Sequence, residues 1–267
     1  MSKWPDNNGD IMRAIEFKQI KEHFNNYKVI NESEFIKYFF ECFPERSKKF
    51  YNNYLTDLYK NNVLYRYDTD LLKLSNEKKE FIFNNSIDDE LKNKLESIEP
   101  VIDISIWRLS DLNRFMSLQP FLNIIFVETY YYAIDVIVNL LMDCGKKVVI
   151  EDDYDTYVKY NRVDELYVIR KINEDSPINR RNSLHNVDEK KTNIVFPKIE
   201  KVIVDIIVDD IFNTILSDET YRILCELLKK YKINMATIKR YATKKHALGG
   251  VMFAIKSTGF NIETGEF

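Results

Sequence analysis

The first sixty residues repeat hydrophobic positions at the three- and four-residue spacing of amphipathic helices. The repeat predicts helices over residues 11–24, 35–43 and 45–60. Asn31 and Glu34 have the spacing of a capping box ahead of the second helix. Asn61 and Asn62 can end the third helix, because asparagine tolerates the left-handed backbone conformation found at helix C-termini.

Two short apolar runs follow around a polar turn, and together they predict a β-hairpin. The runs are residues 63–67 and 71–74, and the turn is Asp68-Thr69-Asp70. Three helices followed by a hairpin are typical of a winged helix-turn-helix, so we expect that fold over residues 1–83. In such a domain the third helix enters the major groove of DNA.

The third predicted helix has two contrasting faces. With a turn of about 100° per residue, one face carries Tyr51, Tyr54, Leu55 and Leu58. The other face carries Lys48, Lys49, Asn52, Asn53, Thr56 and Lys60. Asparagine can form two hydrogen bonds to adenine, and lysine contacts phosphate or guanine. Arg46 and the hairpin residue Arg66 would add phosphate contacts. We interpret this face as a DNA-binding surface, and a merely solvated helix face is the alternative.

Residues 84–99 are polar and acidic, and we expect them to form a connector between two domains. Acidic residues outnumber lysines in this segment, which holds no large aromatic residue. A helix over Asp88–Ser97 fits its pattern. Residues 100–267 would then form a larger second domain.

Predicted strands and helices alternate in the second domain. The strands are predicted over residues 101–107, 123–128, 147–150, 166–171 and 193–196. The helices are predicted over residues 110–118, 131–143, 155–161, 197–216, 217–230 and 234–245. Gly145 lies where a helix C-terminus favours glycine. The alternation favours an α/β layer with some parallel strand pairs. We therefore expect an α+β protein, with an N-terminal winged helix-turn-helix and a larger α/β domain that ends in helices.

The composition restricts the kinds of function that the chain can have. Its 6 glycines form no dinucleotide-binding or P-loop run. The 39 basic and 42 acidic residues give a net charge of -3, which excludes a wholly basic nucleic-acid binder but allows a basic patch. Cys42, Cys144 and Cys225 are far apart in apolar surroundings, so we expect buried, reduced thiols.

We expect a cytoplasmic protein that makes no contact with a membrane. Residues Met1–Asp10 are polar and lack the apolar core of a signal peptide. The most apolar stretch, residues 123–144, contains Glu128 and Asp135, so it does not have the composition of a membrane span.

No catalytic or metal-binding constellation stands out, so we expect no enzyme, no cofactor and no metal. The isolated histidines are His23, His185 and His246. Asp205 and Asp209 are four residues apart in a predicted helix and could share a divalent ion. We favour polar helix positions beside an apolar core for these residues and for Asp210. A metal-dependent nuclease of a phage-defence system remains an alternative function, although Glu151-Asp152-Asp153 lacks the lysine that such sites require.

Residues 229–246 contain seven basic residues and no acidic one. These basic residues are Lys229, Lys230, Lys232, Lys239, Arg240, Lys244 and Lys245. Such a local excess in a chain of net charge -3 marks a possible second basic surface. A further DNA-backbone contact, a dock for an acidic partner and a solvated face are all open interpretations.

Six segments of the second domain carry a resemblance to a known family. They are Ile104-Ser-Ile-Trp107, Leu112-Asn-Arg-Phe115-Met116, Gln119-Pro120, Ile124-Ile-Phe-Val-Glu128, Phe196-Pro-Lys-Ile-Glu200-Lys-Val-Ile-Val-Asp205 and Ile238-Lys-Arg-Tyr241-Ala242. Together these segments resemble the AbiEi-type antitoxins of bacterial type IV toxin–antitoxin (abortive infection) systems. Ile199 replaces the leucine that is usual in the family's P-x-L-E-K-x-L-V-D stretch. The turn Asp68-Thr69-Asp70 stands where the wing of the family often contains glycine.

The resemblance implies a non-enzymatic regulator, with a C-terminal antitoxin domain of α/β type. Such a protein binds inverted repeats in its own promoter, represses its operon and counters a nucleotidyltransferase-like toxin, without necessarily forming a tight complex with it. The residues of the third helix independently favour DNA binding, whereas the antitoxin role follows from the resemblance alone. A protein-interaction scaffold that does not bind DNA is a further alternative.

Overall fold

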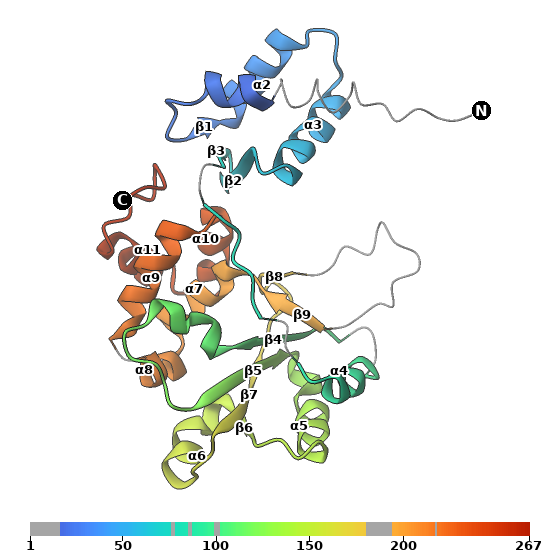
Figure 1. The fold of residues 1–267 in the computed structure, drawn as a ribbon, viewed down its shortest axis with the longest axis vertical. Coiled ribbons are helices and arrows are strands. Elements are labelled where there is room, and N and C mark those ends of the chain that lie inside the picture. Colours follow the sequence, from blue (N-terminus) through green and yellow to red (C-terminus); the bar gives the residue numbers. More distant parts are fainter. Residues whose placement is uncertain (1–16, 76–77, 85–86, 99–101, 180–193, 217) are drawn as a thin grey trace, which may run out of the picture. The chain divides into compact units, whose positions relative to one another are not determined.

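The chain is a mixed α/β protein that divides into two compact units (Figure 1). The computed structural model describes residues 17–75, 78–84, 87–98, 102–179, 194–216 and 218–267. The first unit contains the residues up to Glu80 together with residues 229–236 and 259–267. The second unit contains residues 81–228 and 237–258. His185 and the greater part of the predicted loop around it lie outside the described residues.

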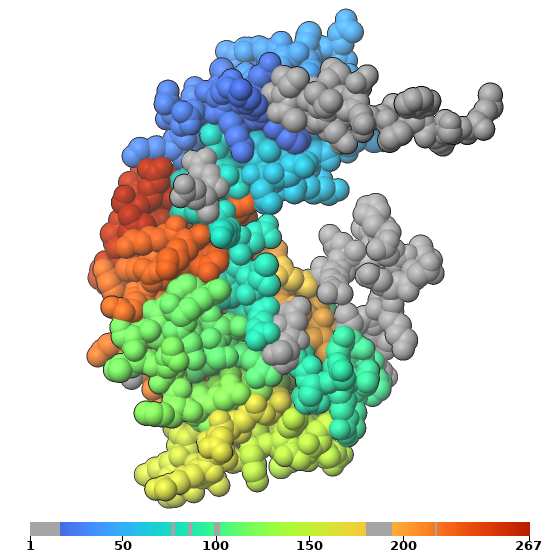
Figure 2. All heavy atoms as spheres, in the orientation of Figure 1, coloured from blue at the N-terminus to red at the C-terminus, as the bar shows by residue number. Residues whose placement is uncertain are grey.

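Two C-terminal segments belong to the first unit, although the sequence pattern placed all of residues 100–267 in one domain. Backbone hydrogen bonds attach the first of these segments: Lys79 donates its amide to the carbonyl of Lys230, and Lys232 donates its amide to the carbonyl of Lys79. Residues 259–267 cover part of the predicted hairpin, and Figure 2 shows these dark red residues beside the blue N-terminal ones. The units are therefore compact in space without being continuous in sequence.

The first unit places helices against a three-stranded antiparallel sheet. Its elements are a helix at residues 17–23, β1 (Ile30–Asn31), α2 (Glu32–Cys42), α3 (Lys48–Lys60), β2 (Leu64–Asp68) and β3 (Leu71–Leu74). The strand order is β1-β3-β2, and Ile30 of the unpredicted strand β1 faces Leu72. The three predicted helical regions and the predicted hairpin are all present within the described residues.

The predicted inner face of α3 is confirmed. Its buried residues are Tyr51, Tyr54, Leu55 and Leu58, and they share one hydrophobic core with Phe35 and Phe39 of α2 and with strand leucines. The helix begins at Lys48 rather than at residue 45, because the Ser47 hydroxyl caps it by accepting the Phe50 amide at 3.3 Å. Asn62 has a φ of 55°, which confirms that asparagine ends this helix in the left-handed region.

The predicted capping box of α2 is wrong. Asn31 is the N-cap residue, but its side chain makes no capping hydrogen bond to the described residues. The carbonyl of Asp70 instead accepts the Glu32 amide at 2.9 Å. Pairing between β1 and β3 brings that carbonyl to the helix start, so the sheet satisfies a donor that a side chain was expected to satisfy.

The second unit is built on a mixed six-stranded sheet, which contains the predicted parallel strand pairs. The strands are β4 (Ile104–Arg108), β5 (Asn123–Thr129), β6 (Val148–Ile150), β7 (Glu165–Lys171), β8 (Ile178–Asn179) and β9 (Ile194–Pro197). Their order is β6-β7-β5-β4-β9-β8. Strands β5, β6 and β7 run parallel to one another, and β4 runs antiparallel to β5 and parallel to β9. The short strand β8 was not predicted.

Most predicted helices of the second half are present, with three differences. The observed helices are α4 (Asp89–Glu96), α5 (Ile134–Asp143), α6 (Tyr154–Tyr160), α7 (Ile199–Val208), α8 (Asp210–Leu216), α9 (Glu219–Lys230), α10 (Met235–Lys244) and α11 (Leu248–Ser257). Three short 3₁₀ helices are η1 (Leu109–Phe115), η2 (Tyr131–Ala133) and η3 (Glu151–Asp153). Thus η1 replaces the α-helix predicted over residues 110–118, α11 was not predicted, and Asp209 in an extended conformation separates α7 from α8.

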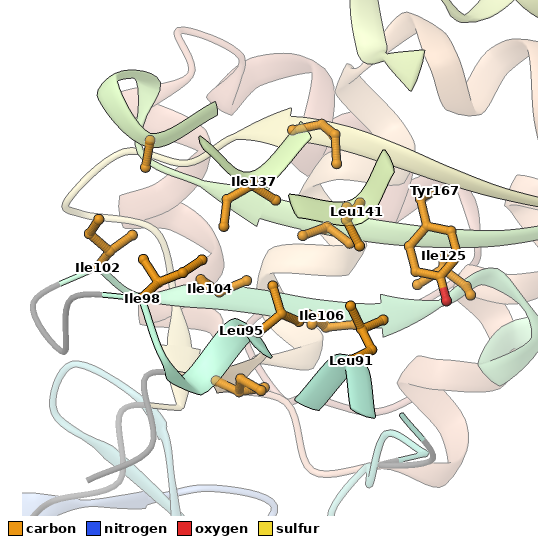
Figure 3. Packing of buried hydrophobic residues seen from close by; sticks show 14 residues of the cluster. Leu91, Leu95, Ile98, Ile102, Ile104, Ile106, Ile125, Ile137, Leu141 and Tyr167 are labelled. Carbon is orange, nitrogen blue, oxygen red and sulfur yellow. The ribbon is translucent and has the colours of Figure 1, made fainter. Parts of the chain in front are cut away.

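The acidic segment is part of the second unit's core and not a solvated connector. Its helix α4 is present as predicted, and the Asp88 carboxylate caps it by accepting the Leu91 amide at 2.7 Å. Leu91 and Leu95 are buried against the strand residues Ile104 and Ile106 (Figure 3). The connector interpretation failed because the two leucines, four residues apart, form a narrow apolar stripe among charged residues.

The cysteines are free, but they are less buried than predicted. Cys42 is exposed at the end of α2, and Cys144 and Cys225 are half-buried. Gly145 has a φ of 70°, in agreement with the predicted glycine at a helix C-terminus. Within the described ranges, no helix combines the length and the apolar character that crossing a bilayer requires.

Replacement of Leu95 by alanine tests whether α4 belongs to the core. Leu95 is fully buried, so Leu95→Ala is expected to lower the free energy of unfolding by about 2–5 kcal/mol. Urea denaturation of the full chain measures this difference. The exposed neighbour Lys92 supplies the control, Lys92→Ala, and similar small effects of both substitutions would contradict the packing of α4.

Candidate functional site

The outer face of α3 presents all six of the predicted DNA-contacting side chains to solvent. The exposed residues are Lys48, Lys49, Asn52, Asn53, Thr56 and Lys60. Arg46, just ahead of the helix, is also exposed, and its guanidinium lies 4.4 Å from the centre of the Phe50 ring. The first turn of α3 contains no acidic residue, and its last turn contains Lys60. The face is therefore cationic and rich in amide groups.

Arg66 is not available for the predicted phosphate contact. Its guanidinium donates two hydrogen bonds to the Glu32 carboxylate, at 2.9 and 3.0 Å, and a third to the carbonyl of Thr69. The bidentate pair ties β2 to the first turn of α2, and it raises the pKa of Arg66. Arg66 therefore has a structural role, which sequence reasoning missed because Glu32 precedes it by 34 residues.

One face of the hairpin is covered by the C-terminal residues of the same unit. The Tyr67 hydroxyl donates to the carbonyl of Ile262 at 2.6 Å, and the Lys73 ammonium donates to the carbonyl of Thr264 at 2.8 Å. Gly265 has a φ of 68°, and a β-carbon there would lie 2.8 Å from the Tyr67 ring. The close approach therefore requires glycine at this position.

The predicted second basic surface is not one free surface. Lys229, Lys230 and Lys232 belong to the first unit, whereas Lys239, Arg240, Lys244 and Lys245 belong to the second. Lys244 pairs with Asp175 at 2.8 Å, and Lys245 is bound to Asp205 and Asp209. These basic residues are close in the sequence, but they belong to two units and make different contacts.

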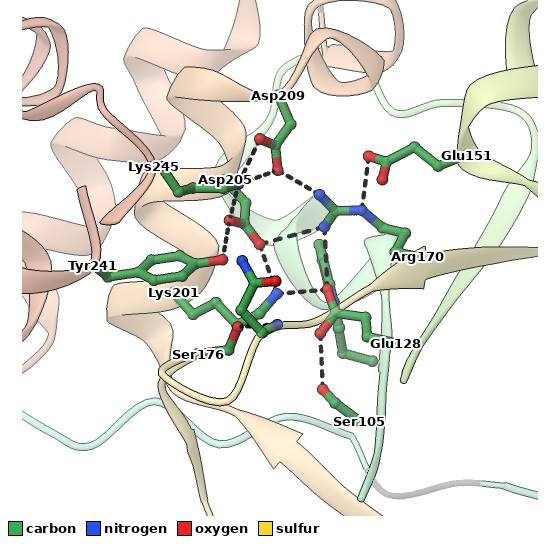
Figure 4. Close-up of polar contacts among 12 residues, drawn as sticks. Ser105, Glu128, Glu151, Arg170, Ser176, Lys201, Asp205, Asp209, Tyr241 and Lys245 are labelled. Carbon is green, nitrogen blue, oxygen red and sulfur yellow. Dashed lines mark hydrogen bonds and ion pairs between the residues drawn. The ribbon is translucent and has the colours of Figure 1, made fainter. Parts of the chain in front are cut away.

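A cluster of buried charges lies at the carboxyl ends of three parallel strands in the second unit (Figure 4). Glu128 comes from the end of β5, Arg170 from the end of β7, and Glu151 directly follows β6. Helix α7 adds Lys201 and Asp205, one turn apart, and both are buried. The carboxyl ends of parallel strands meet at one edge of a sheet, so these groups converge although they are distant in sequence.

Arg170 and Lys201 bridge the strands to α7. Arg170 donates to Glu128 at 3.1 Å, to Glu151 at 2.9 Å and to Asp205 at 3.3 Å. Lys201 lies 2.6 Å from a Glu128 oxygen and 2.7 Å from an Asp205 oxygen. Because Arg170 is 5% exposed and Glu128 is fully buried, these are low-dielectric contacts whose loss would leave a buried charge unpaired.

Lys245 pairs with both aspartates of the cluster. Its ammonium lies 2.8 Å from Asp205 and 2.5 Å from Asp209, and the Tyr241 hydroxyl donates to Asp205 at 3.0 Å. Asp209 also accepts a hydrogen bond from Arg170. Each Asp205 oxygen thus accepts two donors.

The pKa shifts of the two aspartates go in opposite directions. Burial favours the neutral form of Asp205, but Lys201, Arg170 and Lys245 outweigh it and lower its pKa. Burial and the neighbouring charge of Asp205 raise the pKa of Asp209. The two carboxylates raise the pKa of Lys245 against the effect of its burial. Asp205 is therefore the stable anion at the centre of the cluster.

The arrangement is one of ion pairs and not of metal ligands. No group of three or more histidine, cysteine or acidic side chains with metal-site geometry is present among the described residues. Asp205 and Asp209 do lie together, as the hypothesis of a shared divalent ion required, but Lys245 and Arg170 occupy their oxygens. A divalent ion would have to displace both cations.

The outer rim of the cluster reaches an open cleft with a volume of about 530 Å³. The cleft is lined by Glu151, Asp152, Tyr154, Asp155, Arg170, Lys171, Val208, Asp209, Asp210, Ile211 and Lys245. Five of these residues are acidic and three are basic, so groups of both signs of charge line the cleft.

Sequence reasoning missed the roles of Arg170 and Lys201. A signal was present, because each interrupts a run of apolar residues that the pattern assigned to the core. A charged residue at a core position requires a buried partner. The partner itself could not be read from the sequence, since Glu128 is separated from Arg170 by 42 residues and from Lys201 by 73.

Removal of the Arg170 charge tests the cluster. Arg170→Met would leave Glu128 and Asp205 short of a buried cation, so we expect the free energy of unfolding to fall by about 3–5 kcal/mol. Urea denaturation at neutral pH gives the value. Arg162→Met, at an exposed position, is the matched control, and equal stability of the two variants would show that the ion pairs are not needed.

Comparison with known sequences assigns the chain to a family. The matching family model spans residues 50–258, from the first turn of α3 to the end of α11. The match includes every charged residue of the buried cluster. No curated protein matches the chain. The chain belongs to the family of unknown function DUF6577.

Proposed function

We propose that this protein binds double-stranded promoter DNA through the outer face of α3 and represses transcription of its own operon. The observation that carries the proposal is the exposure of Lys48, Lys49, Lys60 and the two adjacent asparagines on a helix whose opposite face is core. Lysines of this kind neutralise phosphates, and asparagine side chains read adenine edges. The rest of the first unit holds this face outward.

The order of elements supports a winged helix-turn-helix as the frame for this surface. A helix at residues 17–23 is followed by β1, α2, α3 and the β2–β3 hairpin, and β1 adds a third strand beside the hairpin. In the proposed fold α2 supports α3, and α3 lies in the major groove. The proposed wing makes a limited contribution, because Arg66 and Lys73 are engaged within the unit.

We propose the antitoxin role on the resemblance to AbiEi-type antitoxins, with a nucleotidyltransferase-like toxin as functional partner in the cytoplasm. The most recognisable resembling stretch, Phe196–Asp205, forms the end of β9 and most of α7. Its charged residues Lys201 and Asp205 are buried in the charge cluster. The stretch thus stabilises the second unit, and the proposed role does not require it to form a tight complex with the toxin.

The two alternatives are less well supported by the geometry. A metal-dependent nuclease would need acidic groups free to bind a metal, whereas the Asp205 and Asp209 carboxylates are paired with Arg170 and Lys245. A scaffold without DNA affinity would not require a helix face composed of lysine, asparagine and threonine. Binding experiments distinguish the scaffold from the repressor directly.

Charge reversal on α3 tests DNA binding. The variant Lys48→Glu/Lys49→Glu/Lys60→Glu is expected to weaken binding to the operon's promoter by at least about a hundredfold. The slope of log affinity against log salt should become shallower by roughly 3, one for each phosphate that is no longer neutralised. Fluorescence anisotropy with a labelled promoter fragment at several salt concentrations measures both quantities.

The control for this experiment carries the same change of charge elsewhere. Lys92→Glu/Lys159→Glu/Lys256→Glu alters three exposed lysines of the second unit. It should retain the affinity and the salt slope apart from a small long-range effect. If both triple variants weaken binding equally, only net charge matters and α3 is not the recognition helix.

Co-expression tests the antitoxin role separately. The full chain should protect cells from the nucleotidyltransferase-like protein of its own operon. The triple variant of α3 should still protect, because the second unit is unchanged, but it should no longer repress a promoter-reporter fusion. Growth and reporter output in the same strains give both results. Continued killing in the presence of the full chain would contradict the antitoxin role and leave the DNA-binding proposal standing.

A further inference from the structure

The first unit contains a lysine-rich pocket that the proposed DNA-binding face does not include. Its volume is about 270 Å³. The pocket is lined by Tyr27, Lys28, Tyr65, Lys73, Leu74, Lys78, Lys229, Gly265, Glu266 and Phe267. Four lysines from three parts of the chain thus converge on one small cavity. Glu266 is the only acidic side chain among these described lining residues.

Glu266 neutralises part of this charge. Its carboxylate lies 3.2 Å from the Lys28 ammonium and 3.9 Å from the Lys73 ammonium, and its side chain is 42% exposed. Among the described residues that line the pocket, one carboxylate thus stands beside four lysines. A dianionic group that replaced the Glu266 carboxylate would balance the lysines better, because two negative charges would face them.

The pKa values of two of these lysines are lowered. Burial, and then the charge of Lys28, lower the pKa of Lys73, although Glu266 opposes the shift. Burial, and then the charge of Lys73, lower the pKa of Lys78 to about 8. Cations that are held close together at the rim of a concave site are typical of a place where an anion binds.

Aromatic rings stand beside the lysines. Tyr27 and Phe267 are exposed and Tyr65 is half-buried, and all three line the pocket. The Lys229 ammonium lies 4.8 Å from the centre of the Phe267 ring. A ligand that joins an anionic group to a flat ring would use both kinds of contact, since bases stack on aromatic side chains.

The pocket lies on the opposite face of the sheet from α3. Tyr65 and Lys73 alternate along β2 and β3 with Leu64 and Leu72, which pack in the core shared with α3. Successive side chains of a strand point to opposite faces. A duplex held on the outer face of α3 is therefore separated from the pocket by the core and the sheet, which favours a small ligand over the bound DNA.

We propose that this pocket binds a phosphate-bearing small molecule of the mononucleotide class. The phosphate would lie among Lys28, Lys73 and Lys78 in place of the Glu266 carboxylate, and the base would lie against the aromatic rings. The proposal does not depend on DNA binding by α3. It adds a ligand site, and a ligand here would rearrange the C-terminal residues that cover the hairpin.

Isothermal titration of the full chain with AMP and with sodium sulfate at constant ionic strength tests the proposal. AMP should bind, and more tightly than sulfate, because only AMP offers a ring. Lys73→Gln and Lys78→Gln should each weaken AMP binding by about tenfold or more, the value of one charge-assisted contact. Glu266→Gln should tighten it severalfold by removing the competing carboxylate. Lys37→Gln, on the exposed side of α2, is the matched control.

Proton uptake provides a readout that a merely structural role of Lys78 would not produce. Sulfate does not titrate near pH 8, and an anion in the pocket raises the pKa of Lys78. At pH 8 sulfate binding should therefore take up about half a proton, measured in two buffers of different ionisation enthalpy. Among the described lining residues, the other charged or titratable groups include Lys28, Lys73, Lys229 and Glu266, together with Tyr65, whose pKa is raised to about 12 by burial. Lys78→Gln should remove the larger part of the uptake, and the lowered pKa of Lys73 accounts for the remainder.

Three results would overturn the proposal. The first is no heat of binding for either anion at millimolar concentration. The second is equal weakening by Lys37→Gln and Lys73→Gln. The third is loss of affinity for promoter duplex in Lys73→Gln without any effect on AMP, which would assign the lysines to nucleic acid. Loss of DNA binding by the α3 variant affects none of these tests, so the two proposals fail independently.

Discussion

The buried ion pairs around Arg170 and Lys201 hold the second unit together. They join β5, β7, α7 and the residue that follows α10, four parts of the chain that no local interaction brings together. Removing such charges from water costs several kcal/mol for each ion, and the cost is offset only if every partner is present. The sheet order that brings the ends of β5, β6 and β7 together is therefore also the order in which these charges can all be paired.

The two units use their charged side chains differently. Lys201 pairs with Asp205 inside the cluster, and Lys245 pairs with Asp209 at the rim of the open cleft. The first unit differs, because the lysines of α3 are exposed and those of its pocket outnumber the acid beside them. In a chain of net charge -3, lysines thus gather on two faces of the first unit, the two faces for which we propose anionic ligands.

The elements that could be predicted were those whose signal is local. The faces of α3 follow from the spacing of Tyr51, Tyr54 and Leu58, and the left-handed conformation of Asn62 follows from its side chain. The acidic helix α4 shows the limit of this reasoning. Its extent was predicted from composition and pattern, but its leucines could be placed in a core only once the strands that cover them were known. The capping of α2 by the Asp70 carbonyl could not be predicted for the same reason, because it depends on the pairing of β1 with β3.

The sequence by itself determined the mixed α/β class, the helical and strand segments, and the polar face of α3. Tertiary structure alone decided which charges are free. Arg66 and Lys245 were expected at surfaces, but Glu32 and Asp205 bind them from distant positions in the chain. The physical reason is that periodicity depends on neighbours along the chain, whereas the state of a charge depends on its burial and on the partners that the fold brings within about 4 Å.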